Sequence, residues 1–136
     1  MTLLARFVHL SVAERLLLVR AFAWVLFFRA LLPFAPLPAL LRISNGPVQA
    51  RAALGSSTIA WAVRAAASRI PGARCLARSL ALQALLRRSG HESSLNIGVR
   101  REGADLEAHA WVTCEGRTVD DEPGTVAYTA FDPLPR

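Results

Sequence analysis

The spacing of apolar residues changes at Ser89-Gly90, and this change constrains the fold more than any other feature of the chain. Before it, apolar side chains recur every three or four residues, which is the period of a helix. After it, they alternate with polar ones, which is the period of a strand. Helices first and strands afterwards predict an α+β fold, with a helical N-terminal half followed by a small antiparallel sheet. The 136 residues are enough for a single domain with one core.

The N-terminal helix is the most apolar one. Ser11-Val-Ala-Glu14 has the pattern of a capping box and predicts a helix that runs to about Leu32. Apolar side chains such as Leu16, Phe22 and Trp24 cover most of its circumference. A helix of this kind is either buried in its own domain or docked on the surface of another molecule. Two interpretations stay open, packing on the chain's own core and contact with a partner protein.

The apolar N-terminal region does not predict a transmembrane segment. Arginines interrupt the apolar run and prolines break the stretch after it, at Arg15, Arg20, Arg29, Pro33, Pro36 and Pro38. The longest uncharged stretch, residues 30–41, is too short and too rich in proline to cross a bilayer. No secretory signal pattern precedes the cysteines. The sequence therefore predicts a cytoplasmic protein in which Cys75 and Cys114 are free thiols.

Further elements are predicted on both sides of the change of period. After a connector at 43–55, with a helical turn around 48–54, two helices are predicted at 57–69 and 74–88. Strands are predicted at 95–99, 106–114 and 117–120, and turns at 101–103 and 115–116. The tail after Gly124 is predicted to be irregular and to pack across the sheet.

The net charge of +6 does not predict nucleic-acid binding. The arginines are scattered, and no basic stripe interleaves with stacking aromatic residues. The positive charge favours a solvated surface that could attract an acidic peptide. No paired CxxC or HxxxH spacing exists, so no metal site is predicted.

Cys75 stands where the third predicted helix begins, shortly after Pro71-Gly72. A thiol there meets the unpaired N–H groups and the positive end of the helix dipole, and both favour the thiolate. Arg74 and Arg78 add positive charge, and the Cys75 N–H is free to bind an oxyanion. Cys75 is therefore the candidate nucleophile, and the alternative is a small buried apolar residue.

His109 lies in the middle of a predicted strand, between Ala108 and Ala110. These small neighbours leave room for the imidazole to lean onto the start of a helix. His109 and Trp111 share one face of the strand, while Cys114 points to the other. His109 is thus the candidate base, Trp111 is expected to pack beside it, and Cys114 is interpreted as structural.

Asp120 and Asp121 compete for the third catalytic position. With a two-residue turn at 115–116, Asp120 lies on the same face as His109. A three-residue loop or one bulge brings Asp121 there instead, so geometry leaves both open. A thiol, an imidazole and a carboxylate in this order form a Cys-His-Asp triad, in which the carboxylate orients the imidazole.

Four motifs resemble a known family: CLARSLAL from Cys75, LLRRSG from Leu85, LNIGV from Leu95 and AHAWV from Ala108. They are similar to the transglutaminase-like cysteine peptidases that remove leaders from lasso-peptide precursors. The resemblance covers about residues 57–122, and the apolar helical N-terminal half is similar to the stand-alone peptidase subunit of the split type. It implies a transglutaminase/papain-like core.

The resemblance also implies roles for single residues. Cys75 corresponds to the nucleophile of that family and His109 to the base. The family's aspartate follows the histidine by about twelve positions, which selects Asp121 as the third member. The chain departs from the pattern at Thr113, where the family more often has glutamate, so the role of that glutamate is not carried over. No metal and no cofactor are implied.

Partners are implied as well. The substrate would be a precursor peptide with leader and core, bound through a separate leader-binding recognition protein, and an ATP-dependent lasso cyclase would take the product. Residues 1–55 are then expected to dock the partner, and residues 56–136 to form the catalytic core. Two other functions stay open: an acyl transferase with the same triad, and a non-enzymatic scaffold that delivers a peptide.

Overall fold

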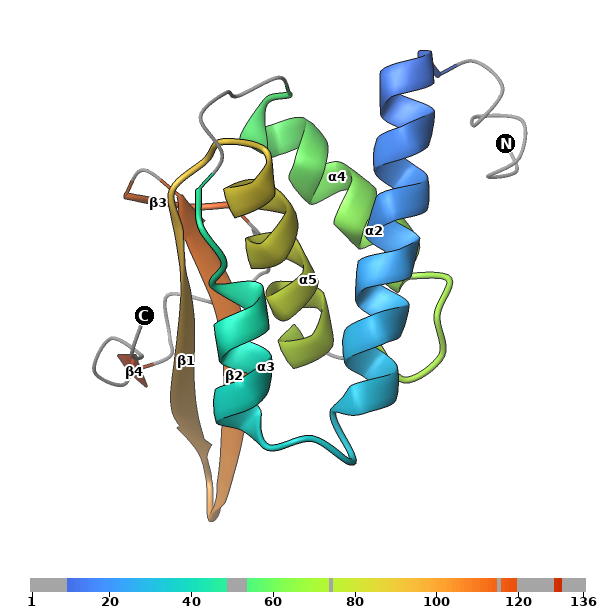
Figure 1. Cartoon of the computed structure of the whole chain (residues 1–136). Helices are drawn as coiled ribbons and strands as arrows, with labels where there is room; N and C mark the ends of the chain where they lie inside the picture. The colour runs from blue at the N-terminus through green and yellow to red at the C-terminus, as the bar shows by residue number, and fades with distance from the viewer. Residues whose placement is uncertain (1–9, 49–53, 74, 115, 120–128, 131–136) are drawn as a thin grey trace.

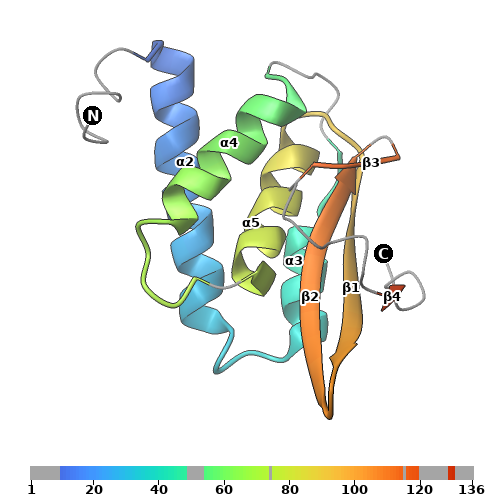
Figure 2. The same cartoon turned by 180° about the vertical axis from the view of Figure 1, so that it is seen from behind.

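Helices come first and strands after them, as the change of spacing predicts. The computed structural model describes residues 10–48, 54–73, 75–114, 116–119 and 129–130. In Figures 1 and 2, which view the chain from opposite sides, α5 (Cys75–Arg88) lies between the sheet and α2 (Val12–Leu31). The predicted α+β class, with a helical N-terminal half and a small antiparallel sheet, is confirmed.

The start of α2 is capped as predicted. The Ser11 hydroxyl accepts a hydrogen bond from the N–H of Glu14 at 3.2 Å. One side of the helix packs on α4 (Ser56–Ala67) and α5, and it is made of Leu17, Leu18, Ala21, Val25 and Phe28. The opposite side carries exposed apolar residues, namely Val12, Leu16, Val19, Leu26 and Phe27. None of the described helices is long and apolar enough to cross a membrane.

The structure corrects the prediction for the segment after α2. Residues 37–44, where the prolines were expected to prevent a helix, form α3 (Leu37–Ser44). Pro38 lies in its first turn, where the missing N–H has no partner within the helix in any case and the fixed φ suits helical geometry. The helical turn predicted around 48–54 falls largely outside the described residues.

The helices α4 and α5 agree with the prediction to within two residues. The end of α5 is closed by two backbone hydrogen bonds. The N–H of His91 donates to the carbonyl oxygen of Leu86 at 2.8 Å, and the N–H of Gly90 donates to that of Arg87 at 3.2 Å. Gly90 has a φ of 91°, which only glycine adopts readily, so the pair forms a Schellman motif that stops the helix at the predicted place.

The middle helix, α5, is buried almost completely. Every residue from 79 to 86 is buried, including two polar ones, Ser79 and Gln83. At the end of α3, the Ser44 hydroxyl shares its proton between the Leu80 carbonyl oxygen (2.8 Å) and Gln83 Oε1 (2.9 Å). Gln83 Nε2 in turn donates to Asn45 Oδ1 at 3.4 Å. Buried polar groups need such partners, so this small network fixes α3 against α5.

The central strands form a long hairpin. β1 (Ser93–Glu102) and β2 (Asp105–Cys114) pair antiparallel along their whole length, from Ser93 opposite Cys114 to Glu102 opposite Asp105. The turn is therefore Gly103-Ala104, slightly later than the predicted 101–103, and Gly103 supplies the positive φ of 62°. Both strands extend closer to the turn than predicted: β1 ends at Glu102 instead of Val99, and β2 begins at Asp105 instead of Leu106.

Short strands complete the sheet in the order β3-β2-β1-β4. Cys114 pairs with Arg117 at the start of β3 (Arg117–Thr118), so the predicted two-residue turn at 115–116 is confirmed. On the other edge, β4 (Thr129–Ala130) pairs with β1 at Gly98 and Val99. The sequence predicted an irregular tail, which is wrong for these two residues, because a two-residue strand carries no detectable alternation.

Phe28 offers a direct test of this packing. Its side chain is fully buried between helices and stacks on Trp24 with ring centroids 5.6 Å apart. We expect Phe28→Ala to lower the free energy of unfolding by about 3–5 kcal/mol, because it leaves a cavity in the core. Phe34→Ala is the matched control, since Phe34 is 86% exposed, and it should change stability by less than about 0.5 kcal/mol. Urea denaturation checks both, and equal losses would contradict the arrangement of α2.

Candidate active site

The helix α5 begins at Cys75, where the sequence predicts a nucleophile. No acidic residue lies in its first turn, so no carboxylate there neutralises the positive end of the helix dipole. The thiol is free and half-buried, and it packs against the margin of the hydrophobic core. This position combines the unpaired N–H groups of a first helical turn with partial access from outside.

A hydrogen bond joins this helix to the edge of β2. The carbonyl oxygen of Val112 accepts from the N–H of Val119 at 3.0 Å, so it points out of β2 on the side of β3. Carbonyl groups two residues apart in a strand point the same way, and Ala110 therefore presents its carbonyl oxygen at the same edge. The buried Ser79 hydroxyl donates to it at 3.1 Å. The bond ends one residue away from His109.

The start of α5 lies close to this contact. Cys75 precedes Ser79 by four residues, which is about one helical turn or 6 Å along the axis. In Figures 1 and 2 the N-terminal end of α5 is level with the middle of β2. By residue number, His109 belongs to the middle of this strand. The fold thus brings the helix of the thiol against the strand of the imidazole.

His109 is buried, with 7% of its surface exposed. Its ring stacks on the Trp111 ring, with centroids 5.8 Å apart and planes 18° from parallel. The prediction that Trp111 packs beside His109 is therefore confirmed. Across the hairpin, the residue paired with His109 is Gly98, which has no side chain to cover the imidazole from β1.

Alternation along β2 separates His109 and Trp111 from the core. Ala110, Val112 and Cys114 belong to the hydrophobic cluster formed with the helices, while the two aromatic rings lie on the other face. Cys114 is buried and about 17 Å along the strand from His109, in keeping with a structural role. α5 packs on the face that Ala110 and Val112 share and also contacts β1, so the side chain of His109 leaves β2 from the opposite face.

The carboxylate candidates, Asp120 and Asp121, lie outside the described residues. The structure therefore does not decide between them. It does establish the two-residue turn at 115–116, which is the condition under which sequence reasoning places Asp120 on the face of His109. The family resemblance selects Asp121 instead, so the turn geometry and the resemblance favour different residues.

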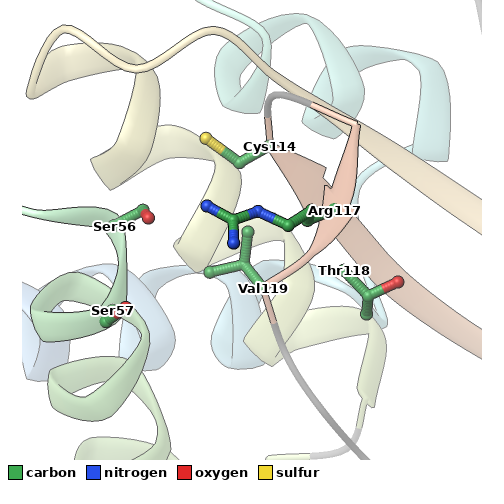
Figure 3. A pocket seen from close by; sticks show the side chains of 6 residues that line it. All are labelled: Ser56, Ser57, Cys114, Arg117, Thr118 and Val119. Carbon is green, nitrogen blue, oxygen red and sulfur yellow. The ribbon is translucent and has the colours of Figure 1, made fainter.

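A separate hollow of about 180 Å³ lies at the far end of β2. Figure 3 shows its lining, which comes from the start of α4 and the turn into β3: Ser56, Ser57, Cys114, Arg117, Thr118 and Val119. The Arg117 guanidinium extends toward Ser56 (Figure 3). Neither Cys75 nor His109 lines this hollow, so it is distinct from the candidate active site.

Sequence reasoning assigned no role to Ser79, although the structure makes it the link between α5 and β2. The available signal was a hydroxyl among apolar residues of a helix, which needs a partner when buried. Within the described part of the chain, no group of three or more histidine, cysteine or acidic residues could hold a metal ion. A thiol at a helix start and an imidazole on a contacting strand are the groups that thiol-based acyl transfer uses.

Comparison with known proteins identifies the family. Searches of curated proteins and of solved structures found no match. A family model described as the transglutaminase-like superfamily matches residues 16–135, which include Cys75, His109 and both aspartates. The match extends over most of the chain, and the chain therefore belongs to the transglutaminase-like superfamily.

Proposed function

We propose that this protein is a cysteine peptidase that removes the leader from a ribosomally made lasso-peptide precursor. The observation that carries the proposal is the Ser79–Ala110 hydrogen bond, which holds the helix of Cys75 against the strand of His109. The superfamily includes cysteine peptidases, and it supports this class of chemistry. The lasso-peptide substrate rests on the motifs around Cys75 and His109 and on the apolar N-terminal helix.

The mechanism derives from the proposed roles. The Cys75 thiolate attacks the scissile carbonyl carbon, and the N–H of Cys75 stabilises the oxyanion of the tetrahedral intermediate. The imidazolium of His109 protonates the leaving amine as the C–N bond breaks, which leaves the leader as a thioester on Cys75. His109 then takes a proton from water, whose oxygen attacks the thioester and releases the leader and the free thiol. The core peptide leaves with a free N-terminal amine.

The exposed side of α2 supports the proposal that the protein binds a partner. Its exposed apolar residues lie along one side of the helix, at spacings of four, three and seven residues from Val12 to Leu26 with Phe27 beside them, and a surface of this kind is typical of interaction sites. We define the α2 stripe as Val12, Leu16, Val19, Leu26 and Phe27. We propose that it docks the leader-binding recognition protein, so that residues 1–55 serve docking and residues 56–136 serve catalysis.

The proposed cellular setting is derived from the chemistry. A reducing cytoplasm keeps a nucleophilic thiol out of disulfides, and Cys75 and Cys114 are not joined by a disulfide in the structure. The amine released from the core would then be available to an ATP-dependent lasso cyclase. The cytoplasm is thus the compartment in which both proposed steps fit together.

Removal of the thiol tests the enzyme proposal. We expect the protein, incubated with a lasso precursor peptide and its leader-binding protein, to cut the precursor once between leader and core. Cys75→Ala should abolish the cut, because it removes the proposed nucleophile, whereas Cys114→Ala should retain it. Intact-mass spectrometry of the peptide measures both. Cleavage by Cys75→Ala would refute the proposed nucleophile.

The product mass also separates the other candidate functions. An acyl transferase would join the leader to an amine, and the leader product would be heavier than the hydrolysed one by that amine less water. A delivery protein would leave the peptide uncut, and precursor binding would survive Cys75→Ala. Either result would replace the peptidase proposal.

The third catalytic residue can be decided by a matched pair of variants. We propose Asp121, on the strength of the family resemblance, and therefore expect Asp121→Asn to lower kcat/KM by about 10³- to 10⁴-fold. Asp120→Asn removes the same charge from the adjacent position and should lower kcat/KM by less than about tenfold. The reverse order would assign the role to Asp120, as the two-residue turn suggests.

Charged substitutions on α2 test the docking surface. Leu16 and Leu26 are 60% and 57% exposed, so Leu16→Asp and Leu26→Asp should abolish binding of the recognition protein while leaving the fold intact. Leu17→Asp is the contrasting variant, because Leu17 is fully buried and a carboxylate there should unfold the chain. Calorimetric titration and circular dichroism check the two effects. Loss of helical signal in the Leu16 or Leu26 variant would defeat the docking proposal.

A further inference from the structure

The segment that leads into Cys75 is held by a residue of α2. Arg29, in the last turn of that helix, donates from Nε to the carbonyl oxygen of Pro71 at 3.2 Å. The two residues are 42 positions apart in the chain, and Pro71 precedes Cys75 by only four residues. A long-range contact thus acts on the short loop between α4 and α5.

This loop contains a β-turn, and contacts on both sides fix the peptide group between Pro71 and Gly72. The N–H of Ala73 donates to the carbonyl oxygen of Ile70 at 3.2 Å, which closes the turn over Pro71 and Gly72. Proline at the second position and glycine at the third, with a φ of 78°, is the pattern of a type II turn. The Pro71 carbonyl takes no part in closing the turn, so its protein partner comes from elsewhere, and that partner is Arg29.

Arg29 also packs directly against Gly72. A Cβ atom added at position 72 would lie 2.5 Å from Arg29 Nε and 2.7 Å from Nη2. Glycine therefore meets two requirements at once, the left-handed φ and the close approach of the guanidinium. Hydrogen bond and packing together fix the orientation of the Pro71–Gly72 peptide group.

We propose that Arg29 is a positioning residue for Cys75, an inference that rests on the proposed nucleophilic role of that thiol. The turn ends at Ala73, two residues before α5 begins, so its orientation sets how the chain enters the helix. Cys75 is only half-buried, whereas residues 79–86 of the same helix are buried. Packing therefore restrains Cys75 less than it restrains those residues. The Arg29 contact supplies the missing restraint and keeps the thiol at the N–H groups of the first turn.

The test is the rate at which iodoacetamide alkylates Cys75 at pH 7, measured by mass spectrometry of the peptide that contains it. Wild-type Cys75 should react faster in the folded chain than in denaturant. Arg29→Ala should lower the folded-state rate by about two- to five-fold, the size of a lost helix-terminus interaction. Arg29→Lys should restore part of it, because an ammonium group can donate to the same carbonyl. Arg20→Ala, an exposed arginine of the same helix, is the matched control and should react like wild type.

The direction of the change separates positioning from simple loosening. A contact that only stabilises the loop would, when removed, expose the half-buried thiol and raise the rate. An unchanged or raised rate in Arg29→Ala would therefore overturn the proposal, provided that wild-type Cys75 is activated. If wild-type Cys75 is not activated, the proposed function fails instead. Should Arg29→Ala not fold, Arg29→Met keeps the length of the side chain without the hydrogen-bond donor and must lower the rate if the proposal is right.

Discussion

The burial of α5 on all sides is the constraint on which the rest of the structure depends. This helix contacts α2, α3, α4, β1 and β2, and water does not reach its central residues. Its polar side chains must therefore find partners inside the protein. Ser79 finds one on the edge of β2 and Gln83 finds one at the end of α3. Two polar residues thus add directional contacts to the apolar packing that holds the sheet and α3 against the helix.

The same burial fixes the body of α5, so a reactive group at its start stands on a rigid element, while the first turn itself is only partly buried. Catalysis needs groups held within a fraction of an ångström, and packed elements achieve this better than loops do. Breaking the Ser79–Ala110 bond would leave a buried polar atom unpaired, at a cost of about 1–3 kcal/mol. The position of the helix relative to β2 is therefore restrained energetically as well as sterically.

Sequence patterns predicted the elements better than their positions in space. Capping at Ser11, the end of α5 at Gly90 and the two-residue turn at 115–116 each depend on local chemistry, and each was found. The most apolar helix, α2, was expected to be buried or docked, and it is buried along one side only. The most completely buried of the described helices is α5, which contains Ser79 and Gln83. The hydrophobicity of a sequence does not show which helix will be surrounded by the other elements of the fold. In the candidate site, the positions of Cys75 and His109 on a helix start and a strand were predictable. The hydroxyl that joins these two elements depends on tertiary contacts and was not.

The position of α2 gives a physical reason why the proposed peptidase and its proposed partner could act together. The inner side of the helix packs on α4 and α5, its outer side presents the α2 stripe, and its last turn carries Arg29. A packed helix is stiff, so a force on the stripe is transmitted along its length rather than absorbed locally. Leu26 of the stripe lies three residues before Arg29, on the same stretch of helix. Contact between a partner and Leu26 would therefore act within one helical turn of the residue that holds the loop before Cys75.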